Sequence, residues 1–130
     1  MRKVKIVVFT VVGLGLMAGT LFTVAGTRRF VAGARTAPGE VVRLNAGGAH
    51  PQVRFVTAEG ETVEYPQGGM IWGYRRGDRV TVLYDPRHPS DGPTLDTAGA
   101  LWGFEATTFL MGAVFVVLAQ LAWWRPGWVE

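Results

Sequence analysis

Residues 6–27 have the sequence IVVFTVVGLGLMAGTLFTVAGT, which is 22 consecutive positions without a charged side chain. As an α-helix, a run of this length extends roughly 30 Å, which matches the hydrocarbon core of a bilayer. The sequence therefore predicts a transmembrane helix over residues 4–27. We expect this helix to continue outside the membrane to about residue 37, because Pro38-Gly39 is the first sequence that would end it.

The first segment also has features of a cleaved signal peptide. It begins with a basic region, and Thr23-Val24-Ala25 resembles a cleavage site of small residues. However, the apolar run is longer than the apolar region of a signal peptide. Arg28 and Arg29 follow it directly and are placed as interfacial anchors. These observations favour an uncleaved helix.

A second apolar segment lies near the other end of the chain. Residues 106–124, ATTFLMGAVFVVLAQLAWW, form 19 more positions without a charge. Trp102 precedes them and Trp123 and Trp124 close them, and tryptophan favours the two membrane interfaces. The sequence therefore predicts a second transmembrane helix over residues 98–124.

Two features of these helices are candidates for specific contacts. Gly15 and Gly19 form a G-x-x-x-G pattern, which lets helix backbones approach closely in a membrane. We favour packing against the second helix, with homodimerisation as the alternative. Glu105 is the one charged residue within the second span and lies in its first two or three turns. A helix hairpin would place it at the depth of Arg28 and Arg29, so we expect an interfacial charge pair.

Composition and charge exclude several classes of function. The chain has no cysteine, which excludes disulfides and thiolate chemistry. The net charge is +3, but residues 28–105 contain nine arginines and nine carboxylates. A nucleic-acid-binding domain would show a basic excess there, so no nucleic acid partner is expected.

The region between the helices, residues 39–96, is predicted to be a small β-rich domain. Apolar and polar residues alternate in it, with Val53 and Phe55 on one face and Gln52 and Arg54 on the other. Four to five short strands separated by turn residues favour a barrel-like or curled antiparallel sheet. The fold class is therefore α+β, with two transmembrane helices flanking the sheet.

A family resemblance rests on three features of this region. Gly60 lies at the tip of a predicted hairpin, residues 77–86 have the sequence GDRVTVLYDP, and Leu95-Asp96 leads into the second apolar segment. The chain resembles the bacterial domain-of-unknown-function 3592 family, small membrane proteins with helices flanking a β-domain. The resemblance implies a topology and no activity.

The residues that could carry chemistry form no convincing catalytic or metal site. His88, Ser90 and Asp91 lie together as in a hydrolase, but a turn explains this loop better. Asp85 and His50 could join them around a metal, although the spacing matches no known metal motif. We therefore expect no enzyme, no metal and no cofactor.

The segment before residue 77 is unusually apolar for a connection between strands. It could act as a plug over the open end of the sheet, or as a loop that binds a protein or lipid headgroups. Its candidate residues are Met70, Ile71, Trp72, Tyr74, Arg75 and Arg76.

The sequence as a whole predicts a non-enzymatic β-module, held in the bacterial cytoplasmic membrane, that acts through protein or lipid contacts. An accessory subunit of a membrane enzyme or transporter is the alternative, and a hydrolase is a third possibility. The partners would be the lipid bilayer and another membrane protein or a second copy of the chain. Basic residues near the spans favour termini in the cytoplasm and the β-domain outside it.

Overall fold

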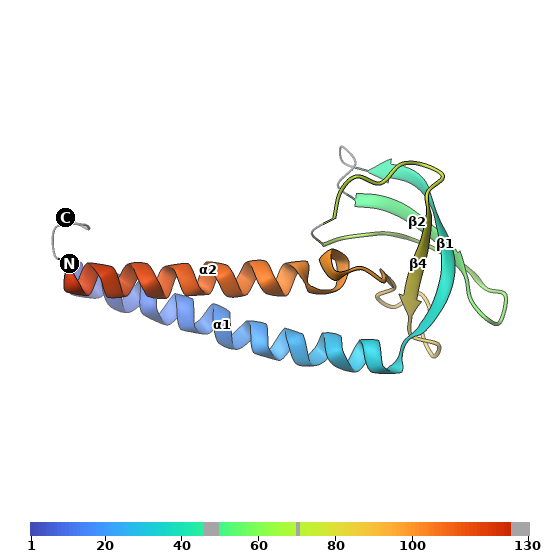
Figure 1. Ribbon diagram of the computed structural model, residues 1–130. Helices are drawn as coiled ribbons and strands as arrows, with labels where there is room; N and C mark the ends of the chain where they lie inside the picture. The colour runs from blue at the N-terminus through green and yellow to red at the C-terminus, as the bar shows by residue number, and fades with distance from the viewer. Residues whose placement is uncertain (46–49, 70, 126–130) are drawn as a thin grey trace. The chain divides into compact units, whose positions relative to one another are not determined.

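One long helix precedes and another follows a curled, five-stranded antiparallel sheet in the computed structural model, which describes residues 1–45, 50–69 and 71–125 (Figure 1). The chain forms two units, a helical unit of Met1–Ala25 with the residues from Glu105 on, and a sheet unit of Gly26–Phe104. In chain order the elements are α1 (Arg2–Gly33), β1 (Arg35–Asn45), β2 (His50–Val56), β3 (Thr62–Pro66), β4 (Arg79–Tyr84), β5 (Thr94–Leu95) and α2 (Ala98–Trp124).

The strands lie in the order β3-β2-β1-β4-β5, and every neighbouring pair is antiparallel. β1 is the longest strand and organises the sheet. Its first part, Arg35–Glu40, pairs with β4, and its second part, from Gly39 to Asn45, pairs with β2. Because its two neighbours bind different parts of its length, the sheet curls into a half-barrel. The predicted antiparallel sheet is thus confirmed.

The first helix ends earlier than the sequence predicted. It stops at Gly33, whereas we expected it to continue to about residue 37, and β1 runs through Pro38-Gly39. Val41 exchanges backbone hydrogen bonds with the segment next to β4, donating to Asp78 and accepting from Gly77. Backbone N–H groups of successive residues in a strand point to opposite sides, so the nitrogen of Pro38, three residues before Val41, points away from β4. The N–H that proline lacks therefore costs the pairing with β4 no hydrogen bond.

The inner face of the sheet contains the core of the sheet unit. Val53, Phe55 and Val82 are buried there, and the Phe55 ring contacts Tyr65 edge-on and Tyr84 at a tilt, with centroids 6.0 and 5.4 Å apart. This is the face that alternation in the sequence predicted for β2. Burying these side chains stabilises the sheet by roughly 1.5–3 kcal/mol for each large apolar residue.

The buried side chain of Gln67 bridges the two edges of the half-barrel. Its Oε1 accepts hydrogen bonds from the Tyr65 hydroxyl at 2.8 Å and from the Leu95 backbone N–H at 2.9 Å. Its Nε2 donates to the Gly68 carbonyl and to Thr94 Oγ1. Burial raises the pKa of Tyr65, with a smaller contribution from Tyr74, so the phenol remains a donor. One amide therefore joins the end of β3 to β5.

The two helices of the helical unit pack through Gly13 and Gly112, not through the predicted Gly15 and Gly19. A Cβ atom added to Gly13 would lie 2.6 Å from the Gly112 carbonyl oxygen, and one added to Gly112 would lie 2.7 Å from that of Gly13. A Cβ atom at Gly15 or Gly19 meets nothing within 4 Å. The prediction that Gly15 and Gly19 pack against the second helix is therefore wrong, because both lie away from the contact. The alternative of homodimerisation through them stays a prediction.

Buried positions recur at every seventh residue in each helix. The buried positions of α1 are Ile6, Gly13 and Thr20, and those of α2 include Glu105, Gly112 and Ala119.

Both helices are long and apolar enough, by length and composition, to cross a membrane.

Candidate functional site

A β-bulge in β1 shapes the surface that we consider the candidate site. Val41 pairs with Val53, but the next pair joins Arg43 to Gln52, so Val42 is the extra residue of β1. Beyond the bulge, Arg43 and Leu44 are both exposed. Bulges of this kind change the direction in which side chains point.

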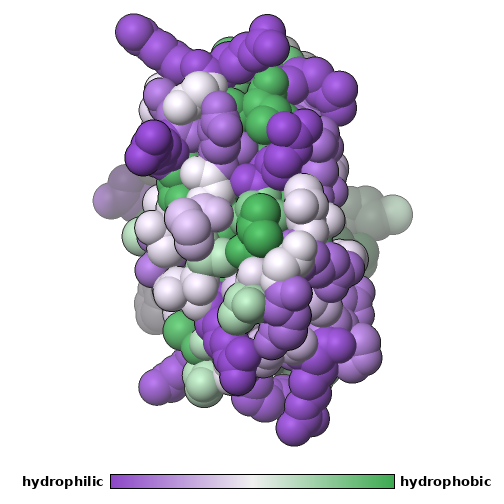
Figure 2. All heavy atoms as spheres, turned by 90° about the vertical axis from the view of Figure 1, so that its right-hand side faces the viewer, coloured by the Kyte–Doolittle hydropathy of each residue, from purple (hydrophilic) through white to green (hydrophobic). Residues whose placement is uncertain are grey.

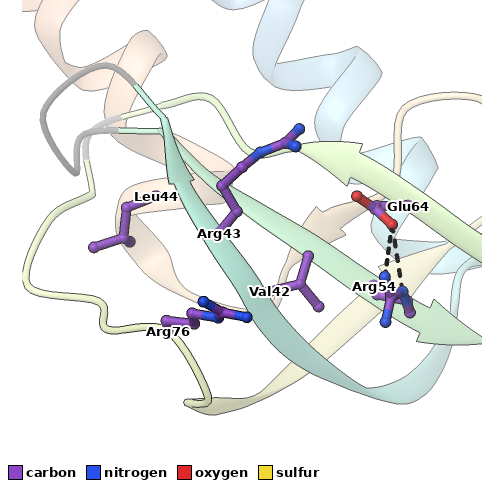
Figure 3. A pocket seen from close by; sticks show the side chains of 6 residues that line it. All are labelled: Val42, Arg43, Leu44, Arg54, Glu64 and Arg76. Carbon is purple, nitrogen blue, oxygen red and sulfur yellow. Dashed lines mark hydrogen bonds and ion pairs between the residues drawn. The ribbon is translucent and has the colours of Figure 1, made fainter.

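The bulge borders an open pocket of about 490 Å³ on the surface of the sheet unit (Figure 3). Val42 lies between Arg76 on one side and the Arg54–Glu64 pair on the other in that view. Arg76 comes from the connection before β4, whereas the other lining residues come from β1, β2 and β3. The pocket is lined by Val42, Arg43, Leu44, Arg54, Glu64 and Arg76.

A chain of side-chain hydrogen bonds crosses this surface from β1 to β3. Arg43 Nε donates to Asn45 Oδ1 at 3.2 Å, and Asn45 Nδ2 donates to Gln52 Oε1 at 3.1 Å. Gln52 Nε2 then donates to one carboxylate oxygen of Glu64, and Arg54 donates twice to the other. Two arginines are thus held at the two ends of one polar network.

The network is part of a row of alternating charges across the sheet. In the strand registers, Glu64 lies opposite Arg54, Arg54 lies opposite Glu40, and Glu40 lies opposite Arg79. The Arg54–Glu64 ion pair has an N–O distance of 3.1 Å, and both side chains are partly exposed. An exposed pair of this kind contributes at most about 1 kcal/mol to stability, so its main effect is to fix where the charges lie.

The apolar connection before β4 divides between the core and the surface. Ile71 is buried in the core of the sheet unit, and Tyr74 packs against that core. Trp72 is 75% exposed, and Arg75 and Arg76 are exposed as well. Met70 lies outside the described residues. A contact role for the exposed residues stays a prediction.

A tight turn holds the end of this connection. The Arg75 backbone N–H donates to Asp78 Oδ2, and the Asp78 N–H donates back to the Arg75 carbonyl. Gly77 within the turn has a φ of 93°, a conformation that other residues rarely adopt. Because Gly77 also donates to Val41, this turn places Arg76 next to the bulge of β1.

The predicted interfacial charge pair joins residues of both units. Arg28 and Arg29 belong to the sheet unit, and Glu105, which is buried, belongs to the helical unit. The pairing of these charges stays a prediction.

The loop considered for a hydrolase or a metal lies on the surface. His88 Nδ1 is 3.9 Å from Asp85 Oδ2, and both side chains are well exposed, as is Ser90. His50 is elsewhere, where its ring contacts the Gln67 carbonyl. Within residues 1–45, 50–69 and 71–125, no three potential ligands among His, Cys, Asp and Glu gather around a point where a metal ion could bind.

Sequence reasoning identified some members of the candidate site and missed others. Alternation in β2 placed Arg54 on the outer face, and Arg76 was a candidate for contacts. Arg43 and Leu44 were not identified, because the bulge that exposes them depends on strand pairing.

Comparison with known proteins gives one informative match. The chain is 43% identical to the immune protein Tsi4 of Pseudomonas aeruginosa over 110 residues, which are 85% of this chain and 76% of that protein. No family model and no solved structure matches the chain. The resemblance to the domain-of-unknown-function 3592 family therefore stays a prediction.

This match corrects the function that the sequence predicted. The sequence predicted a β-module that acts through unspecified protein or lipid contacts, with an accessory subunit or a hydrolase as alternatives. The relative is named as an immune protein, which is a specific role, so the predicted function is wrong.

Proposed function

This chain belongs to the family of the immune protein Tsi4, and we propose that it is itself an immunity protein, which protects the cell that makes it by binding a toxic protein. The observation that carries the proposal is the identity of 43% over 110 residues. Any contiguous stretch of that length in a chain of 130 residues includes residues 21–110. The whole sheet unit therefore lies within the shared region.

The proposed mechanism is binding and not catalysis. An immunity protein of this kind blocks its toxin by occupying a surface that the toxin needs, so one molecule protects against one toxin molecule. The sheet unit suits this task because two of its exposed arginines, Arg43 and Arg54, are held in place by hydrogen bonds before any partner arrives. A binding group that is already ordered loses less entropy when the complex forms.

The proposed location is the cytoplasmic membrane of a bacterium, with α1 and α2 as spans and the sheet unit on the outer side. Supporting this, both helices have the length and composition of membrane spans. Large apolar side chains such as Phe22, Leu110 and Val117 are also more than half exposed along them. Lipid contact would cover this apolar surface.

The test is a protection assay in a bacterial host. We choose the product of the adjoining gene as the candidate toxin, because an immunity protein must be made wherever its toxin is made. We expect co-expression of the full chain to restore growth of cells that express this toxin, and protection to require at least equal amounts of the chain. A chain with an early stop codon is the control.

Two results would contradict the proposal. One is continued growth arrest although the full chain accumulates in excess of the toxin. The other is full protection when the chain is far less abundant than the toxin, which would indicate an enzyme.

A further inference from the structure

We infer that the pocket beside the bulge of β1, lined by Val42, Arg43, Leu44, Arg54, Glu64 and Arg76, is where an acidic segment of the toxin binds. This inference rests on the proposed function and assigns the surface that performs it. The pocket is large enough for a few side chains of a partner, and it is open to solvent.

Charge complementarity identifies the chemistry of the segment. Three of the lining residues are arginines and one is a glutamate, and that glutamate is already bound by Arg54. The hydrogen bonds described above use one N–H donor of Arg43 and two of Arg54, whereas a guanidinium has five. The donors that remain suit carboxylates, which arginine binds in a bidentate manner.

The arginines are positioned by the fold. Arg43 and Arg54 lie at the two ends of the network through Asn45, Gln52 and Glu64, which restricts their rotamers. Arg76 is placed by the turn that Asp78 closes. Two guanidinium groups are therefore preorganised for a partner with matching acids, and the turn brings a third arginine to the same pocket.

Val42 and Leu44 add an apolar element between these charges. Val42 is half-buried and Leu44 is 43% exposed, so a partner side chain could cover both. The face of the sheet unit that Figure 2 shows is mostly hydrophilic, with small apolar groups between the polar ones. An apolar contact within a polar surround is the usual composition of a specific protein interface. The expected toxin segment therefore contains an apolar side chain flanked by aspartate or glutamate.

The experiment measures binding of the full-length chain to the purified product of the adjoining gene, in detergent, by titration at low and at physiological salt. The variants are Arg76→Glu and Arg43→Glu, and the matched control is Arg87→Glu. Arg87 is an exposed arginine outside the pocket. All three variants change the charge equally, and thermal unfolding checks that each one folds.

We expect Arg76→Glu and Arg43→Glu each to weaken binding by about tenfold or more, because they place like charges against the acidic segment. Arg87→Glu should change affinity by less than about twofold. Binding of the wild type should weaken as salt rises, and binding of Arg76→Glu should depend on salt less steeply. Protection of cells should fall in the same order.

The outcomes separate this inference from the proposed function. If the wild type protects cells and both pocket variants bind and protect as well as Arg87→Glu, the toxin binds elsewhere and only the inference fails. If the wild type neither binds the toxin nor protects, both fail. If the pocket variants keep toxin binding but lose binding to vesicles with anionic lipid, the pocket serves the membrane and the inference is wrong.

Discussion

Replacing Gln67 by leucine tests the bridge that joins the two edges of the half-barrel. Leucine has a similar volume but can neither accept nor donate a hydrogen bond. The Tyr65 hydroxyl and the Leu95 N–H would both lose the acceptor that they share. Each stranded buried donor costs about 1–3 kcal/mol, and two therefore cost roughly 2–6 kcal/mol. Added apolar burial offsets about 1–2 kcal/mol of this, which leaves a net loss of about 3 kcal/mol.

The assay follows unfolding of the full-length chain in detergent together with hydrogen exchange of the β3 and β5 amides. For a unit of this size, a loss of about 3 kcal/mol corresponds to a melting temperature lower by roughly 15 °C. Exchange should accelerate first in β5, because it has only two residues and pairs only with β4 in the sheet.

The matched control is Gln52→Leu, on the outer face of the same sheet. This change removes two side-chain hydrogen bonds, whereas Gln67→Leu removes four. Water can replace the two bonds of Gln52 on the outer face, so we expect a loss below about 1 kcal/mol. If Gln67→Leu costs no more than Gln52→Leu and β5 stays protected from exchange, then Gln67 does not hold the edges together.

Three further predictions concern the core, the helix contact and alkaline stability. Ile71→Ala should lower the free energy of unfolding by about 2–4 kcal/mol in chemical denaturation, because Ile71 is buried. Trp72 is exposed, so Trp72→Ala should change it by no more than about 0.5 kcal/mol, and equal losses for the two variants would contradict this. Gly112→Ala should cost about 1–3 kcal/mol in thermal unfolding, because the new Cβ would lie 2.7 Å from the Gly13 carbonyl oxygen and 2.9 Å from the Met17 side chain. Gly15→Ala should not destabilise, and a neutral Gly112→Ala would refute the contact. Burial raises the pKa of Tyr65 above its unfolded value of about 10. The stability that the protonated phenol contributes should therefore be complete below about pH 10 and be lost as the pH rises further. Tyr65→Phe should remove this alkaline loss of stability, measured by unfolding at a series of pH values.

The sheet could be predicted from the sequence where one periodicity decided the structure. Val53 and Phe55 alternate with polar residues, and only a half-buried strand gives that pattern. The first half of β1 could not be predicted in this way, because Pro38-Gly39 resembles the end of a helix. Pairing with β4 determines its conformation, and local sequence does not report that pairing.

The helix contact shows a different limit. A G-x-x-x-G pattern indicates that close approach is possible, but each helix has several small residues and the pattern does not say which face meets a neighbour. Gly13 and Gly112 are used because they belong to faces that repeat every seventh residue, with Ile6 and Thr20 in α1 and Ala119 in α2. Comparing this spacing between the two segments is the signal that could have found the contact.

The candidate site was less predictable than the fold because its parts are brought together only by strand pairing. Arg43, Arg54 and Arg76 are far apart in the sequence, and the bulge at Val42 decides that Arg43 faces the same pocket as the other two. A catalytic site restricts residue types, so it leaves a motif. A binding surface is defined by its partner, and the sequence of that partner is not in the chain.

The placement of this surface also separates stability from specificity. The network that positions Arg43 and Arg54 is on the exposed side of the sheet, whereas the buried side chains that hold the fold are on the inner face. Changes among the exposed residues can therefore alter the partner at little cost in folding, since exposed ion pairs contribute little to stability. Specificity between partners needs only a difference in affinity, which a reversed charge at this pocket supplies. If the proposed function and the inferred binding site hold, a change of charge beside the bulge of β1 would change the toxin that is bound while the core around Phe55 is kept.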